Sequence, residues 1–171
     1  YNAPEADIVD LKKLTTSDKV IAGSGLVLFI AYFLTWFKVS FSGGLGIGGE
    51  ATASGGDVGF LWSTFPMLIG LLLAGVVIAT KLFDVKLPDL PIPMGQAFLG
   101  AGGLAALLVI LKLLIGESDE GIPGVEVTRG IGIFIAAIAA IGLAAGGFLK
   151  FQEGDDAAPP AAGGGAGSAP F

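Results

Sequence analysis

Four long apolar runs dominate the pattern of hydrophobic and polar positions along the chain. They occupy about residues 19–37, 60–82, 95–115 and 130–148. Each has roughly the 20 residues that one helix needs to cross the hydrocarbon of a bilayer, and each is apolar around most of its circumference. Backbone groups in hydrocarbon must be satisfied within the segment. The runs therefore predict an all-α integral membrane protein, a bundle of four transmembrane helices.

The segments outside the runs complete the predicted organisation. Residues 1–18 form a cytoplasmic leader, in which Ile8, Leu11 and Leu14 at a spacing of three indicate an interfacial amphipathic helix, with a solvated leader as the alternative. Ser17, followed by Asp18, is the expected N-cap of the first span. Residues 19–149 form the membrane domain, and the Ala/Gly/Pro-rich residues 150–171 are expected to be a disordered tail. A cleaved signal peptide is not expected, because the first run is too long for its hydrophobic part.

The two loops on the outer side are short. In the first, the alternating residues 39–42 and a glycine-rich stretch are compatible with a small hairpin, although a flexible loop is the favoured prediction. Its G-x-G-x-x-G match, at Gly44, Gly46 and Gly49, lacks the βαβ context of a dinucleotide site, and we reject that interpretation. The second loop, residues 117–128, is expected to be a solvated acidic turn.

Composition narrows the possible chemistry. The chain is 53% hydrophobic and 14% charged, and it contains no cysteine and no histidine. Disulfides, thiol chemistry and the usual zinc and haem ligands are therefore excluded, and we expect no catalytic, cofactor or metal site. A net charge of -6 argues against binding to nucleic acid.

Small residues mark the predicted helix contacts. They allow the backbones of two helices to approach closely. In the fourth run they recur at every fourth position, and in the third they gather in the first half. The predicted packing residues are Gly100, Gly103, Gly132, Ala136, Ala140 and Ala144.

Charged and aromatic residues predict the depth and orientation of the spans. Trp36 and Trp62, with Lys38 and Arg129, are expected to anchor the helices at one interface. Lys112 is the one charge well inside a predicted span and a possible functional charge, although we expect it to extend outwards to nearby carboxylates. Six basic residues on the side of both termini, against three on the other, favour a plasma membrane protein with both termini in the cytoplasm. The six are Lys12, Lys13, Lys19, Lys81, Lys86 and Lys150.

The layout also resembles a known group of proteins. Residues 16–19, Thr-Ser-Asp-Lys, lead into the first run, residues 34–37, Leu-Thr-Trp-Phe, end it, and a glycine-rich loop and an Ala/Gly/Pro tail follow. In this the chain is similar to small four-span membrane proteins of actinobacteria, such as the mycobacterial group typified by the 34-kilodalton antigenic protein. The resemblance implies a place in an actinobacterial cell envelope and no particular chemistry.

Packing stripes, short loops and the lack of a reactive constellation together indicate a non-catalytic accessory or scaffold subunit of a larger membrane complex. A respiratory supercomplex and a cell-envelope assembly are both suitable hosts. The expected partners are other integral membrane subunits and lipids, with a homo-oligomer as a further possibility. The alternative is a small transporter or channel subunit, for which the spans offer few polar residues to line a path.

Overall fold

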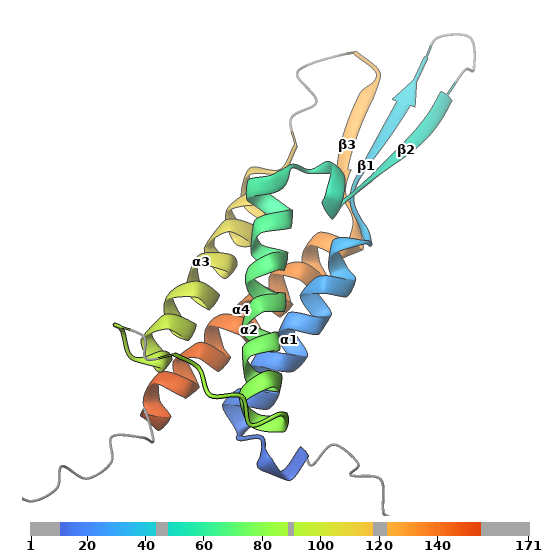
Figure 1. The fold of residues 1–171 in the computed structure, drawn as a ribbon. Helices are drawn as coiled ribbons and strands as arrows, with labels where there is room; N and C mark the ends of the chain where they lie inside the picture. Colours follow the sequence, from blue (N-terminus) through green and yellow to red (C-terminus); the bar gives the residue numbers. More distant parts are fainter. Residues whose placement is uncertain (1–10, 44–47, 89–90, 118–122, 155–171) are drawn as a thin grey trace, which may run out of the picture.

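The computed structural model describes residues 11–43, 48–88, 91–117 and 123–154. Its four long helices are α1 (Thr16–Tyr32), α2 (Phe65–Leu82), α3 (Met94–Ile115) and α4 (Ile131–Glu153). Figure 1 shows them side by side in one bundle, with a small β-sheet projecting from one end. We call that end the sheet end. The opposite end, where α1 begins and α4 ends, is the base.

Three helical segments are long and apolar enough to cross a membrane. They are Phe60–Leu82, Met94–Ile115 and Ile131–Glu153. The first consists of α2 preceded by one π-helical turn, Phe60–Thr64. Pro66 stands in the first turn of α2, directly after the π-helical turn, and contributes no backbone N–H donor there. The helix α1 has 17 residues.

Two helix ends differ from the predicted boundaries. The first span was predicted to reach residue 37, but α1 ends at Tyr32 and Thr35 begins a strand. Aromatic and β-branched residues there fit a pleated strand, and pairing on both sides outweighs continuation of the helix. The fourth helix runs on to Glu153, so residues 150–153, predicted as the start of the tail, are its last turn. The rest of that tail and residues 1–10 of the predicted leader lie outside the described residues; residues 11–13 form one 3-10 turn.

The sheet corrects the all-α prediction. Its strands are β1 (Thr35–Ser42), β2 (Gly48–Ser54) and β3 (Val125–Arg129), antiparallel in the order β2-β1-β3. The hairpin alternative for the first outer loop is therefore correct and the flexible loop is wrong for residues 48–54. The acidic-turn prediction is wrong for residues 125–128, because they belong to β3, which pairs with the free side of β1.

Close backbone contacts hold the helices together. The helix α4 lies between α1 and α3, and α2 packs on α1 and α3. Gly132, Ala136 and Ala140 of α4 are buried and Ala144 is partly buried. A Cβ on Gly102 of α3 would lie 2.7 Å from the Leu143 carbonyl oxygen of α4, so only glycine allows this approach.

Two predicted packing residues do not make such a contact. A Cβ added to Gly100 or Gly103 would meet nothing within 4 Å among the described residues. The buried face of α3 instead follows a different set of positions, which the small-residue content did not distinguish. That set is Gly95, Phe98, Gly102, Ala105, Ala106, Val109 and Lys112.

Candidate functional sites at the two ends of the bundle

A polar cluster joins α1 to α4 at the base. We call Thr15, Ser17, Asp18, Lys150 and Glu153 the base clasp. The Lys150 ammonium lies 2.6 Å from Asp18 Oδ1, and the hydroxyls of Ser17 and Thr15 donate to Glu153 Oε2 at 2.7 Å and 3.2 Å. Ser17 and Asp18 are fully buried. The clasp therefore gives these buried polar groups hydrogen-bond partners and connects the start of α1 to the end of α4.

The start of α1 explains why these side chains converge. Thr15, rather than the predicted Ser17, is the N-cap, and it forms a reciprocal capping box with Asp18. That leaves the Ser17 hydroxyl free to reach Glu153 and the second Asp18 oxygen free to accept from Lys150. One turn of helix thus presents a hydroxyl and a carboxylate to α4.

A cavity of about 240 Å³ opens beside the clasp. Its lining comes from the ends of all four long helices. The polar groups and Met94 lie near the helix ends, and the other apolar groups lie further in. Val76, Val77, Met94 and Phe98 form the apolar wall, and Thr15, Thr80, Lys81, Lys150, Glu153 and Gly154 form the rest. The Lys150 ammonium also lies 5.7 Å from the centroid of the Phe98 ring. The arrangement suits an elongated molecule with one polar and one apolar end.

A second buried lysine lies at the sheet end. The Lys112 ammonium is 2.5 Å from Glu117 Oε1, 5.6 Å from the centroid of the Phe37 ring and 6.0 Å from that of Trp62. The expected outward reach to a carboxylate is therefore present. Asp119 and Glu120, which were expected beside Glu117, lie outside the described residues. The ion pair and the two rings satisfy the charge locally.

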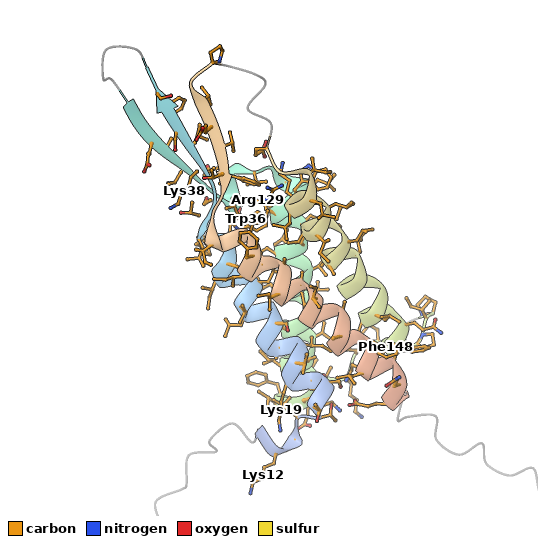
Figure 2. The ribbon with its side chains drawn as sticks, turned by 180° about the vertical axis from the view of Figure 1, so that it is seen from behind. Lys12, Lys19, Trp36, Lys38, Arg129 and Phe148 are labelled. Atoms are coloured by element: carbon orange, nitrogen blue, oxygen red, sulfur yellow. The ribbon has the colours of Figure 1, made fainter. Side chains whose placement is uncertain are left out.

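The predicted interface anchors have three different environments (Figure 2). Trp36 is buried, and its indole N–H donates to the Ala31 carbonyl near the end of α1, 2.8 Å away. Lys38 is exposed on β1, and Trp62 is half-buried. Arg129 ends β3 instead of starting the fourth span, and its guanidinium donates to the Leu113 and Leu114 carbonyls at the end of α3.

A short turn connects the sheet to α2. Asp57 accepts hydrogen bonds from the backbone N–H and the hydroxyl of Ser54, each at 2.8 Å. These bonds favour the ionised carboxylate and lower the pKa of Asp57 below its ordinary value. The buried Ser63 hydroxyl donates to the Gly55 carbonyl and ties the same turn to the start of the second apolar segment.

The sheet has one apolar and one polar face. Cross-strand partners point to the same side, and the register sets Phe41 beside Val125 and Val39 beside Val127. On the other strand, Ala51 is the partner of Val39. The opposite face carries only polar side chains and one glycine: Lys38, Ser40, Ser42, Gly48, Glu50, Thr52, Glu126 and Thr128.

The helices cover only the lower part of the apolar face. Phe37, next to the bundle, is buried, whereas Phe41 is 47% exposed and Ala51 is exposed. Val39, Val125 and Val127 have intermediate exposure. Val127 packs against the core. We call the remaining residues, Val39, Phe41, Ala51 and Val125, the apolar sheet face. Figure 1 shows that β1 and β2 reach well beyond the helix ends.

Sequence reasoning missed the base clasp and the apolar sheet face. The clasp joins residues 132 positions apart, and no local pattern relates them. The signal for the sheet was present in the alternation of residues 39–42, but the third strand could not be recognised until its pairing was known. No group of acidic, histidine or cysteine side chains that could hold a metal ion occurs in the described ranges. No protein-family model, curated protein or solved structure matches the chain.

Proposed function

We propose that the chain is a non-catalytic accessory or scaffold subunit of a larger membrane complex, and that its apolar sheet face binds another subunit outside the membrane. In this proposal α1 is the fourth span. Its 17 residues give a length of about 26 Å at 1.5 Å per residue, which is near the lower limit for crossing a bilayer. Leu26, Val27 and Ile30 on its outer side are exposed and apolar, as a lipid-facing helix surface requires.

Basic residues orient the proposed protein. Lys12 and Lys19 lie at the base, and Lys38 and Arg129 lie at the sheet end (Figure 2). The excess of lysine on the loops of the base favours the cytoplasmic side for it. The sheet would then stand outside the plasma membrane. A respiratory supercomplex or a cell-envelope assembly remains the proposed host, in keeping with the layout shared with small actinobacterial membrane proteins.

The observation that carries the proposal is the uncovered apolar sheet face. Sheets usually bury one apolar face, and three short strands gain stability mainly by packing that face against something else. Here the polar face is suited to water, but Phe41 on the other face is 47% exposed. In contrast to the lipid-facing helices, the sheet projects beyond the bundle, so lipid tails do not cover it. A partner with an apolar surface outside the membrane would bury it.

A crosslinking experiment tests this proposal in the native membrane. A photoreactive amino acid is placed at position 41 on the apolar face or at position 38 on the polar face of the same strand, and the full chain is recovered under gentle detergent. We expect one defined membrane subunit to crosslink from position 41 and not from position 38. The same subunit should co-purify in fixed stoichiometry with the unmodified chain.

Substitutions provide a matched control. Phe41→Thr keeps a strand-forming residue but removes the exposed ring, and Lys38→Thr makes the same replacement on the polar face. We expect Phe41→Thr to release the partner and Lys38→Thr to retain it. Equal retention by both variants, or crosslinks from position 41 only to a second copy of this chain, would contradict the proposal.

A further inference from the structure

The lining of the cavity at the base is complementary to a membrane phospholipid: basic groups lie at the helix ends, and apolar groups lie deeper. Lys81 is the last residue but one of α2, Glu153 is the last of α4, and Lys150 lies in the last turn of α4. The polar part of the lining therefore lies at the helix ends, where headgroups would be. Val76, five positions before Lys81, lies about 7.5 Å deeper along the helix axis. The wall there is apolar and is matched to an acyl chain.

The charges around the cavity leave one lysine available. Lys150 is paired with Asp18, and Glu153 accepts from two hydroxyls of the α1 start. Lys81 also lines the cavity and makes no ion pair within the described part of the chain. The Lys150 ammonium has three donors, so its bond to Asp18 leaves others for a ligand. An anion at the cavity would therefore meet two ammonium groups, of which one has no carboxylate partner among the described residues. It would also face the Glu153 carboxylate, whose charge is partly offset by its two hydroxyl donors.

We propose that this cavity binds an anionic phospholipid, with the phosphate on Lys81 and Lys150 and the first part of an acyl chain against Val76, Val77 and Phe98. Lysine binds phosphate as a point charge, and basic pockets between membrane helices on the cytoplasmic side bind anionic headgroups. A volume of about 240 Å³ is smaller than the ~300–1,000 Å³ of typical small-molecule pockets. The cavity thus holds only the junction of headgroup and chain, and the rest of the lipid lies in the bilayer.

Native mass spectrometry of the purified full chain in a neutral detergent tests this site. The probes are a phosphatidylglycerol and a phosphatidylcholine with identical acyl chains, and inorganic phosphate alone. We expect one phosphatidylglycerol to remain bound per chain at lipid concentrations that leave phosphatidylcholine unbound. Inorganic phosphate alone should not be retained, because it cannot use the apolar wall.

Two kinds of variant separate charge from shape. Lys81→Gln should weaken phosphatidylglycerol binding about tenfold, the loss of one charged hydrogen bond. Lys86→Gln removes an exposed lysine from the following connection, outside the cavity, and should leave binding unchanged. Val76→Trp fills the deep end without altering any charge and should abolish lipid binding. Met94→Trp blocks the cavity from the start of α3 and is the substitute if the first variant does not fold.

Several outcomes would overturn the proposal. Equal retention of the two lipids would show that charge is not recognised. Equal loss of binding in Lys81→Gln and Lys86→Gln would indicate a diffuse effect of surface charge, and binding unaffected by a folded cavity-filling variant would place the lipid elsewhere. Retention of inorganic phosphate as firm as that of phosphatidylglycerol would make this a site for a free anion. None of these results bears on the partner of the sheet, which lies at the other end of the bundle.

Discussion

Two lysines in the last turns of their helices show how differently the two ends of the bundle are held. Lys150 of α4 meets Asp18, which is fully buried and 132 positions away in the sequence. Lys112 of α3 meets Glu117 in the segment that directly follows its own helix, and the Glu117 side chain is 41% exposed. The first pair connects α1 to α4. The second pair connects the end of α3 only to the residues that directly follow it.

The difference teaches that burial of the partner, rather than of the lysine, decides what an ion pair contributes. Both ammonium groups are shielded, with side-chain exposures of 17% for Lys150 and 9% for Lys112. If Lys112 is removed, Glu117 can be hydrated where it stands. If Lys150 is removed, Asp18, which is fully buried in the intact protein, loses its cation and keeps a charge that only Thr15 still hydrogen-bonds, which is the costly case.

The largest effect that would separate the two ends is expected for Lys150→Met. Loss of one partner of a buried pair costs about 3 kcal/mol in the free energy of unfolding. The measurement is reversible unfolding of the purified chain in mixed micelles, followed by tryptophan fluorescence. The double variant Asp18→Asn with Lys150→Met should recover part of the loss, because it removes the unpaired charge as well. A double variant no more stable than Lys150→Met would argue against the charge explanation.

An intermediate effect is expected at the sheet end, where α4 and β1 are held together by a close backbone contact at Gly132. A Cβ on Gly132 would lie 2.7 Å from the Thr35 carbonyl oxygen and 2.9 Å from Trp36 Cδ1. Gly132→Ala should therefore destabilise the chain by about 1–3 kcal/mol. Gly100→Ala is the matched control, since its Cβ meets no described atom within 4 Å. It should not destabilise the chain, because alanine is favoured over glycine inside a helix by up to about 1 kcal/mol. Similar losses in both would show that glycine matters here for flexibility and not for contact.

The smallest effect is expected for Lys112→Met. This variant keeps the apolar stem against Phe37 and Trp62 and frees Glu117 to face water, so it should cost less than about 1 kcal/mol. The tryptophan emission maximum, to which the buried Trp36 and the half-buried Trp62 both contribute, should stay unchanged if the Trp62 ring keeps its position. A loss as large as that of Lys150→Met would make the two ends equivalent and overturn the comparison.

The sequence predicted the helices well because their signal is local and strong. Mean hydropathy over about 20 residues is enough to find Phe60–Leu82 and Met94–Ile115 to within a residue. The end of the first helix was missed because residues 33–37 are as apolar as the helix before them. Their strand conformation depends on partners near residues 53 and 129, which no local window contains.

The candidate sites were harder to predict for a related reason. Within a bilayer, hydrophobicity does not separate inside from outside, so Gly100 and Gly102 look alike in sequence although only the second touches another helix. The cavity is assembled from single residues at the ends of several helices. Lys81, its available cation, has nothing in its immediate sequence to distinguish it from the other lysines at the base.

The base clasp also fixes the order in which the chain can mature. Lys150 is synthesised 132 residues after Asp18. During translation α1 can therefore be capped by Thr15, but the Asp18 carboxylate has no lysine partner until α4 is almost complete. The contact between α1 and α4 at the base therefore forms only after α4 is made. A chain that ends before Lys150 would keep the Asp18 carboxylate without its ion-pair partner.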